Sequence, residues 1–468
     1  MSLRARTPSL VPPARRAAAL ALAIAGAAAC SASTPAPPAG PRAGESAAEP
    51  APVLPAYVEA FDYVWSTIDR THWDPDKVGP AWDQARAELR PEIARARTAD
   101  EARAVLGKLL ARLGQSHFGI VPAEVYGVEP PKAAGGPTGP ASAAPAASAP
   151  EAPGAGGPAT TGLDTRLVDG ALLVIAVEPG SGGDRAGVKP GWIVRRIGGA
   201  PLADILAAAG GERDPALAAF AVQQRMTGPV GGTVELELDG GAGEPTTVAV
   251  ALGTPPGALT GFGHLPPIRV DYRARKLGKD AGYIRLSAFF DPTRVNTAFA
   301  RDLAAFERTR GIVLDLRGNP GGLGAMAMGM GGHLVAESGA SLGTMITRDS
   351  KLSFVLNPQP VRYGGKVAIL VDELCMSTCE ILAGGLQALG RARVFGVSTP
   401  GAALPSQIER LPTGDGFQYA VANYVSASGE PLEGRGVEPD VPVPWDRAAL
   451  LAGRDPAIEA ALAWIRER

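Results

Sequence analysis

The chain is short of cysteine, histidine and net charge. Its 468 residues include 3 cysteines and 4 histidines, and the formal net charge is −2 at pH 7. So few cysteines exclude a disulfide scaffold. Cys375 and Cys379 stand four residues apart with no histidine between them, so neither a metal site nor a cofactor is expected. Because the chain has no basic excess and its body has no Lys/Arg cluster, nucleic acid is not expected as a partner.

Long apolar runs are also missing, and the run at residues 17–29 is too short to span a bilayer stably. It follows four arginines and ends in Ala-Ala-Ala-Cys30, so residues 1–29 are predicted to be a secretory signal. Cleavage before Cys30 would expose a cysteine for lipid attachment, which resembles a bacterial lipoprotein signal; ordinary cleavage after an Ala-x-Ala site is the alternative. Residues 30–52 are predicted to be a flexible tether. We therefore expect an exported protein, anchored by lipid to a bacterial membrane and facing the periplasm or the cell exterior.

Residues 53–123 are predicted to form an N-terminal helical domain. Its clearest helix starts at the capping box Thr98-Ala-Asp-Glu101, carries one apolar face and stops at Gly114. Ser116-His117 therefore follows a helix end, where a side chain can be aimed into a cleft. Residues 124–161 are low-complexity Pro, Ala, Gly and Ser that cannot bury a core, so a disordered linker is predicted there.

Strand patterning returns at residues 162–254. The segments Pro-Gly-Ser-Gly-Gly-Asp-Arg-Ala-Gly-Val188 and Pro-Gly-Trp-Ile-Val-Arg-Arg-Ile197 resemble a PDZ domain of the bacterial type. The alternating run 233–238 fits an edge or half-buried strand. The PDZ resemblance implies that Gly162 and Leu163 lie in the loop that receives a peptide carboxylate, with the peptide added as an extra strand.

Strands and helices alternate through residues 264–468, which predicts an α/β core with a mixed or parallel sheet. The buried strand 312–316 runs into the Gly/Pro/Asn loop 317–322 and then into a helix. The unpaired N–H groups at such a junction suit either a phosphate or the oxyanion of an acyl-transfer intermediate. Phosphate-binding glycine motifs are absent, which favours the oxyanion. Ser377 follows the next strand, at a turn that exposes a nucleophilic hydroxyl above a sheet.

The order of these motifs resembles the tail-specific (carboxy-terminal-processing) peptidases and their relatives in the tricorn-core family. The motifs are Leu-Gly-x-Ser-His, the PDZ-like block, Asp-Leu-Arg-Gly-Asn-Pro-Gly-Gly, the serine turn and Leu-Glu-Gly-Arg-Gly-Val-Glu-Pro-Asp. They cover the chain from Tyr57 to the C-terminus except the linker. The resemblance implies a multidomain α/β (α+β) protein with a helical segment, a PDZ-like domain and a crotonase-like serine peptidase core.

The family has two catalytic designs, and the sequence decides between them. One branch uses a Ser/Lys dyad, but the expected lysine position is Ala402, the accompanying aspartate position is Ala388, and no lysine follows Lys366. The tricorn-like branch uses a histidine instead, and its Val-Asp-Glu-x-x-x-Ser turn is similar to residues 371–377. The chain is therefore expected to follow the histidine design.

Carried over residue by residue, that design implies Ser377 as the nucleophile and His117 as the general base. Ser116 and Glu433 are expected to support the imidazole. The expected oxyanion donors are the backbone N–H groups of Thr378 and of Gly321 or Gly322. Asp315 and Arg317 are expected to order the loop by salt bridges.

Each assignment has a structural alternative. Ser377 could be a helix N-cap, His117 a structural histidine, and Glu433 a solvated residue of a Gly-rich loop. His72 is expected to pack beside Trp73. Cys375 and Cys379 are expected to be buried thiols, with a cysteine nucleophile as the alternative.

Two functions compete. The first is an exported serine endopeptidase that captures polypeptides through the PDZ domain and cuts them in the α/β core, with polypeptide substrates as its partners and a membrane contact only through the lipid anchor. The second is an inactive, peptide-binding lipoprotein that kept the fold. The missing lysine and the unusual Cys-Met-Ser-Thr-Cys turn motivate the second hypothesis. The surviving Ser116, His117, Ser377 and Glu433 favour the first.

Overall fold

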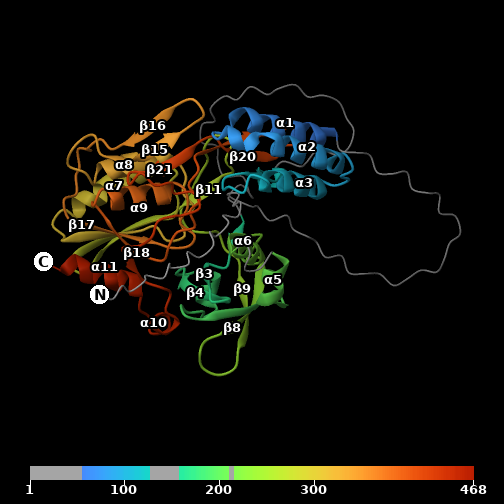
Figure 1. The fold of residues 1–468 in the computed structure, drawn as a ribbon. Helices are drawn as coiled ribbons and strands as arrows, with labels where there is room; N and C mark the ends of the chain where they lie inside the picture. The colour runs from blue at the N-terminus through green and yellow to red at the C-terminus, as the bar shows by residue number, and fades with distance from the viewer. Residues whose placement is uncertain (1–54, 127–157, 210–214, 468) are drawn as a thin grey trace, which may run out of the picture.

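A computed structural model describes residues 55–126, 158–209 and 215–467 of the chain. The predicted signal, Cys30, the tether and most of the predicted linker lie outside these residues. Figure 1 shows three parts: N-terminal helices, a β-rich block and a larger α/β core. The mixed α/β class predicted from the sequence is confirmed. Within the described ranges no helix is both long enough and apolar enough to cross a membrane.

The N-terminal part is helical. Its elements are α1 (Pro55–Thr71), η1 (Pro75–Val78), α2 (Pro80–Ile93), α3 (Ala99–Ala111) and the 3-10 turn η2 (Ala123–Tyr126). The capping box predicted before α3 is only half formed. Thr98 Oγ1 accepts the N–H of Glu101 at 3.1 Å, whereas the Glu101 carboxylate accepts the N–H of Arg97 at 2.8 Å. The Thr98 hydroxyl still satisfies one of the N–H groups that a helix start leaves unpaired.

These helices share a hydrophobic core with a small sheet that includes two strands from the far end of the chain. The strands are β1 (Gly119–Val121), β19 (Ser406–Arg410) and β20 (Gly416–Ala420), joined antiparallel in the order β1-β20-β19. Phe417 and Tyr419 of β20 pack among the buried side chains of α1, α2 and α3. The segment predicted as a separate helical domain is thus packed directly onto a C-terminal sheet, and Figure 1 shows β20 beside α1–α3.

The β-rich block comprises residues 158–253, without 210–214. Its elements are β2 (Ala159–Thr160), β3 (Leu163–Val168), β4 (Ala171–Val177), α4 (Gly182–Arg185), β5 (Ile193–Ile197), β6 (Ala200–Pro201), α5 (Leu202–Ala208), α6 (Pro215–Arg225), β7 (Thr227–Gly228), β8 (Thr233–Asp239) and β9 (Thr246–Ala251). The main sheet has the order β3-β4-β5-β8-β9, with β6 paired to β5. β8 lies between two strands, so it is half-buried and not an edge strand. The predicted linker is also ordered at both ends, in η2 and β2.

The α/β core is built on one large sheet. Its main elements are β12 (Tyr272–Leu277), β13 (Ala281–Leu286), α7 (Pro292–Ala305), β14 (Gly311–Asp315), α8 (Gly324–Gly332), β17 (Lys366–Val371), α9 (Thr378–Ala388), β18 (Arg393–Gly396), β22 (Val441–Pro442) and α11 (Pro456–Arg466). The strand order is β12-β13-β14-β17-β18-β22, and all pairs are parallel except β12 with β13. Of the two predicted alternatives, a mixed or a parallel sheet, the structure has the mixed sheet.

Helices cover both faces of this sheet, as Figure 1 shows. Ile312 and Leu314 of β14 pack in the same cluster as side chains of α7, α8 and α9. Val313, which points to the opposite face, packs against α11. The continuous apolar sequence of the central strands follows from this burial on both sides. The carboxyl ends of β14 and β17 consequently meet at one edge, where the glycine loop and Ser377 follow.

Smaller elements complete the core. They are the hairpin β10 (Ala258–Thr260) and β11 (Ile268–Val270), the sheet of β15 (Ser341–Ile346), β16 (Lys351–Val355) and β21 (Asn423–Ser426), and α10 (Arg447–Leu451). α10 reaches the β-rich block, because its Leu450 packs against Leu173 and Ile193. The C-terminal segment therefore connects that block to the core.

Candidate active site

Ser377 lies at a strained turn between β17 and α9, at the N-cap position of that helix. We call residues 372–378 the elbow. Ser377 has φ 57° and ψ −121°, a backbone conformation that L-residues rarely adopt. Asp372 fixes the start of the elbow, because its Oδ1 accepts the N–H of Gly318 at 2.9 Å and that of Leu374 at 3.1 Å. Strain of this kind persists where surrounding contacts enforce it, and it is concentrated at functional turns.

His117 lies in the turn after α3 and also has a positive φ, 61°. Its Nδ1 is 2.7 Å from Ser116 Oγ, and Ser116 Oγ donates to Glu433 Oε2 at 2.8 Å. Since the single hydroxyl proton of Ser116 goes to Glu433, Ser116 Oγ accepts from His117 Nδ1–H. The imidazole proton therefore sits on Nδ1, and Nε2 carries a lone pair that can accept a proton.

Glu433 is held by three donors. Besides the Ser116 hydroxyl, its carboxylate accepts the N–H of Ser116 at 2.7 Å and the N–H of Ala403 at 3.1 Å. It is therefore a half-buried side chain held by hydrogen bonds and not a freely solvated one. Burial raises the pKa of Glu433 and lowers the pKa of His117 to about 4. The imidazole is neutral at neutral pH.

The loop after residue 400 connects Glu433 to the elbow. The N–H of Ser377 donates to the carbonyl of Ala402 at 2.7 Å, and the next residue, Ala403, donates to Glu433. The structure thus bonds Ser116, His117 and Glu433 to one another, and residues 402–403 link Glu433 to the elbow at Ser377. Within the described part of the chain, no hydrogen bond joins Ser377 Oγ to His117 Nε2, so the Ser–His bond itself is not formed in this state.

The glycine loop, residues 317–322, packs against the elbow. A Cβ added at Gly321 would lie 2.7 Å from Ser377 Cβ and 2.9 Å from the backbone N of Thr378. The N–H of Gly321 is already bonded to Asn319 Oδ1 at 2.8 Å. Among the described residues no acceptor is bonded to the N–H of Gly322 or Thr378. Of the expected anion donors, these two are therefore available and Gly321 is not.

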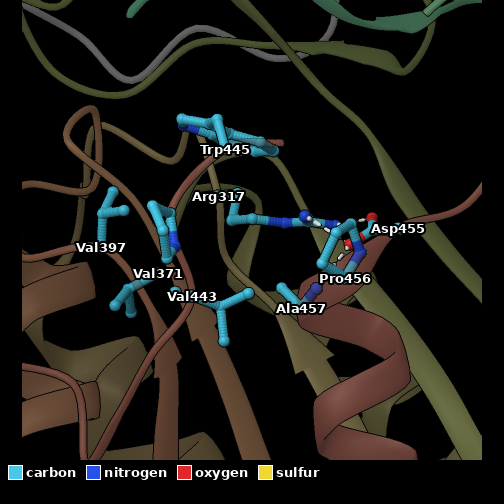
Figure 2. A pocket seen from close by; sticks show the side chains of 10 residues that line it. Arg317, Val371, Val397, Val443, Trp445, Asp455, Pro456 and Ala457 are labelled. Carbon is cyan, nitrogen blue, oxygen red and sulfur yellow. Dashed lines mark hydrogen bonds and ion pairs between the residues drawn. The ribbon is translucent and has the colours of Figure 1, made fainter. Parts of the chain in front are cut away.

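Arg317 and Asp315 order this loop as expected. The guanidinium of Arg317 binds Asp315 at 2.7 Å and Asp455 at 2.8 Å. Burial alone would raise the pKa of Asp315, but the positive charges of Arg317 and Arg285 hold it well below its usual range. Figure 2 shows Arg317 beneath the ring of Trp445 and bonded to Asp455, in a small cavity that Val371 also lines. The guanidinium of Arg317 is bonded to these two carboxylates. We therefore read the cavity as part of the structure that supports the glycine loop, and not as a binding site.

Glu380 is a site residue that the sequence did not reveal. It is fully buried, and its carboxylate accepts the N–H groups of Ser377 at 3.1 Å, Gly401 at 2.8 Å and Ala402 at 3.0 Å, and the hydroxyl of Thr399 at 2.5 Å. Burial raises its pKa to about 7. A glutamate three residues after Ser377, in an otherwise apolar helix, was the available signal. Glu380 therefore joins the elbow to residues 401–402, and the next residue, Ala403, is bonded to Glu433.

The positions at which a Ser/Lys dyad would place its lysine and the accompanying aspartate hold alanines, Ala402 and Ala388. Ala402 is buried and Ala388 lies at the end of α9. Cys375 and Cys379 are free and fully buried, and burial raises the pKa of both thiols, which disfavours the thiolate. Within the described ranges no group of three or more His, Cys, Asp or Glu side chains is placed to hold a metal.

Gly162 and Leu163 lie in the β-rich block, apart from the Ser377 site. Gly162 has φ 75° and packs so closely on Ser181 that an added Cβ would lie 2.2 Å from Ser181 Cβ. Leu163 begins β3, which is the edge strand of its sheet. Further along β3, Arg166 reaches the elbow and binds Asp372 at 2.6 Å. The two regions are therefore joined by a buried ion pair.

The core matches peptidase family S41. Residues 280–443 align with the model of Peptidase family S41, and residues 56–111 with that of the Tricorn protease C1 domain. The carboxyl-terminal-processing peptidases of family S41 are serine proteases, and therefore hydrolases.

Curated relatives are similar over part of their length. Carboxyl-terminal-processing peptidase 3, chloroplastic, of Arabidopsis thaliana is 29% identical over 276 residues, which cover 58% of this chain and 50% of the relative. Carboxyl-terminal-processing protease of Synechocystis sp. is 30% identical over 176 residues, covering 38% of this chain and 41% of the relative. The chain spans half or less of the length of these relatives.

A solved structure shares the fold. The photosystem II D1 C-terminal processing protease has a TM-score of 0.52 and 20% identity, with 86% of this chain and 98% of that chain covered. This likeness extends over the N-terminal helices, the β-rich block and the core. It supports the arrangement of the parts, and the identity is too low to assign residue roles.

Proposed function

We propose that the protein is a serine endopeptidase in which Ser377 is the nucleophile and His117 the general base. The observation that carries the proposal is the chain of hydrogen bonds from His117 Nδ1 through Ser116 to Glu433. This chain holds the imidazole in the tautomer whose Nε2 can take a proton. The match of the core to family S41 supports the same reaction class.

In the proposed reaction, Ser377 Oγ attacks the scissile carbonyl carbon while its proton passes to His117 Nε2. The imidazolium that forms is stabilised by Ser116 and by the negative charge of Glu433. The proton is then delivered to the leaving amine, and water repeats the sequence on the acyl-enzyme. Because the Ser–His hydrogen bond is not formed in the free state, substrate binding is proposed to close that gap.

The oxyanion of the tetrahedral intermediate is proposed to lie between the N–H groups of Gly322 and Thr378. Both are free of other acceptors among the described residues, and the glycine loop packs directly against the elbow. Fixed backbone donors stabilise the developing charge without having to reorganise during the reaction.

The β-rich block is proposed to act as a PDZ-like module that captures a polypeptide end. The peptide would add to the free edge of β3, with its carboxylate at Gly162 and Leu163. Arg166 of the same strand is bonded to Asp372 in the elbow, so occupation of β3 can be sensed at the reaction centre. The peptidase core is proposed to be crotonase-like.

Export, and lipid attachment at Cys30, are proposed from the sequence alone. The inactive-lipoprotein alternative is not favoured, because the match to a peptidase family and the ordered Ser116–His117–Glu433 chain both favour turnover. A nonfunctional site would have no need of the strained backbone at Ser377 and His117.

The test is hydrolysis of an unfolded protein such as casein. Wild type should cleave it, and Ser377→Ala should lose at least about 1,000-fold in kcat/KM. Ser353→Ala, on the exposed strand β16, is the matched control and should cleave at the wild-type rate. Cleavage by Ser377→Ala at the rate of the control would refute the assignment.

A further inference from the structure

His72 is the second buried histidine near the candidate site. It lies just after α1, and its ring stacks between Trp73, at a centroid distance of 5.6 Å, and Phe118, at 5.8 Å. The contact with Trp73 is the packing expected from the sequence. The second contact is with the residue that follows His117.

The ring nitrogens of His72 are both engaged. Nε2 lies 2.8 Å from Gln115 Oε1, and Nδ1 accepts the N–H of Asp74 at 3.0 Å, with the Asp74 carbonyl at 2.9 Å. A neutral imidazole with its proton on Nε2 satisfies Gln115 and the N–H of Asp74 together. Burial lowers the pKa of His72, which keeps the ring neutral. His72 therefore contacts the residues on both sides of Ser116-His117.

The turn between α3 and β1 has little backbone support. Gly114 donates to Ala111, and the next bonded backbone donor before β1 is Ser116, whose partner is the Glu433 side chain. Among the described residues no backbone acceptor is bonded to the N–H of His117. Side chains must consequently fix a turn that holds two residues at positive φ, Gly114 and His117.

We propose that His72 is a positioning residue that fixes the turn carrying His117, through its hydrogen bond to Gln115 and its stack on Phe118. This inference rests on the proposed function of His117 as the base. The backbone carbonyl of His72 is itself fixed, because Arg348 Nε donates to it at 3.1 Å from the β15–β16 turn. The base-bearing turn is thereby tied to the end of α1 and to the α/β core.

The hydrogen bond can be separated from the packing. His72→Phe keeps an aromatic ring between Trp73 and Phe118 but cannot donate to Gln115, and Gln115→Leu removes the acceptor. Both variants should lower kcat by roughly 10- to 100-fold, because a displaced base loses reactive geometry, with KM within about twofold of wild type. The double variant should be no worse than the worse single variant, since both remove one interaction.

His333→Phe is the matched control. His333 is also buried, bonds a backbone carbonyl through Nδ1 and packs edge-on against Phe299, but it lies beyond α8 in the core. It should lower stability without lowering kcat. Equal losses of kcat in His72→Phe and His333→Phe, or additive losses in the double variant, would overturn the proposal.

Amide hydrogen exchange provides a readout that needs no catalysis. In His72→Phe the amide of Ser116, which is bonded to Glu433, should exchange at least about tenfold faster than in wild type, while the amides of α9 keep their rates. Unchanged exchange at Ser116 contradicts the positioning role even if the enzyme is active. If wild type shows no hydrolysis, the proposed function has failed, and the exchange data still decide whether His72 fixes this turn.

Discussion

Ser116 decides which nitrogen of His117 is the base. Because its hydroxyl proton goes to Glu433, it leaves only an acceptor for the imidazole. Ser116→Ala should therefore lower kcat by roughly 100-fold, since the imidazole loses its preferred tautomer and orientation. KM should change little.

Steady-state kinetics on a peptide substrate measures this loss. The chain offers an internal control, because Glu433→Gln breaks the same relay at its far end. Combined with Ser116→Ala it should cost no more than the worse single change. Losses that multiply would mean that the two residues act separately.

The pKa of His117 gives a pH prediction of definite sign. Burial lowers it to about 4, whereas an exposed histidine titrates near 6.5. A protonated imidazole cannot act as base, so activity should persist at about pH 5 and disappear as His117 is protonated near pH 4. With 4 histidines in the chain, ¹⁵N NMR can follow each ring, and His117→Ala assigns the signal. A His117 that titrates like an exposed histidine contradicts the buried geometry.

At the residue scale, motifs that resemble a family were enough to name Ser116, His117, Ser377 and Glu433 as candidates. The structure bonds Ser116 to both His117 and Glu433. Glu380 was not assigned a role although it follows Ser377 by three residues, because its other partners lie 19 to 22 residues away, and His72 bonds Gln115, which is 43 residues away. Burial and bonding of that kind leave no local pattern.

At the scale of elements, the glycine loop and the elbow act as one unit. Gly321 has φ 97°, and a Cβ there would lie 2.7 Å from both Met376 O and Ser377 Cβ. Gly321→Ala should therefore displace the elbow, lower kcat by at least about tenfold and destabilise the fold. Chemical unfolding and kinetics on the same samples measure both effects.

Gly107→Ala is the matched control for that prediction. Gly107 lies inside α3, where an added Cβ would meet nothing within 4 Å. Alanine should stabilise this helix by up to about 1 kcal/mol and leave kcat unchanged. If Gly321→Ala were equally harmless, the close packing of the loop on the elbow would be wrong.

Local patterns predicted the elements of the core well and their partners less well. The buried strand expected at 312–316 appears as β14 within one residue of its expected bounds. The edge position allowed for the strand at 233–238 was wrong, because β8 pairs on both sides. In the capping box, the Glu101 carboxylate accepts the N–H of Arg97 instead of that of Thr98. Pairing and register are set by distant segments, which alternation alone does not specify.

At the scale of the whole molecule, a buried ion pair between Arg166 and Asp372 joins the β-rich block to the core. Arg166 is 2% exposed and Asp372 is 0% exposed. Arg166→Ala leaves the Asp372 carboxylate buried without its cation, which should cost about 3–5 kcal/mol in the free energy of unfolding. Urea unfolding measures this cost.

An exposed pair in the same block is the control. Arg195 binds Asp239 at 2.6 Å, but half of the Arg195 side chain is exposed. Arg195→Ala should cost less than about 1 kcal/mol. Equal costs for the two arginines would show that the Arg166 pair does not stabilise the junction between block and core.

The sequence could not reveal how the parts sit together. The N-terminal helices were predicted as a domain of their own, yet Phe417 and Tyr419 complete their core. That packing is what carries Ser116 and His117 to Glu433, which lies 317 residues from Ser116 in the chain. Contacts of such separation are the ones that periodicity and motif spacing do not encode.

The most direct test of the account is to map where a serine-reactive phosphonate attaches. Peptide mass spectrometry of the treated wild-type protein should find the label on Ser377. His117→Ala should react at least about 100-fold more slowly, because the hydroxyl has lost its base. A label on any other residue, or attachment to Ser377 at the wild-type rate in His117→Ala, would contradict the assignment of nucleophile and base.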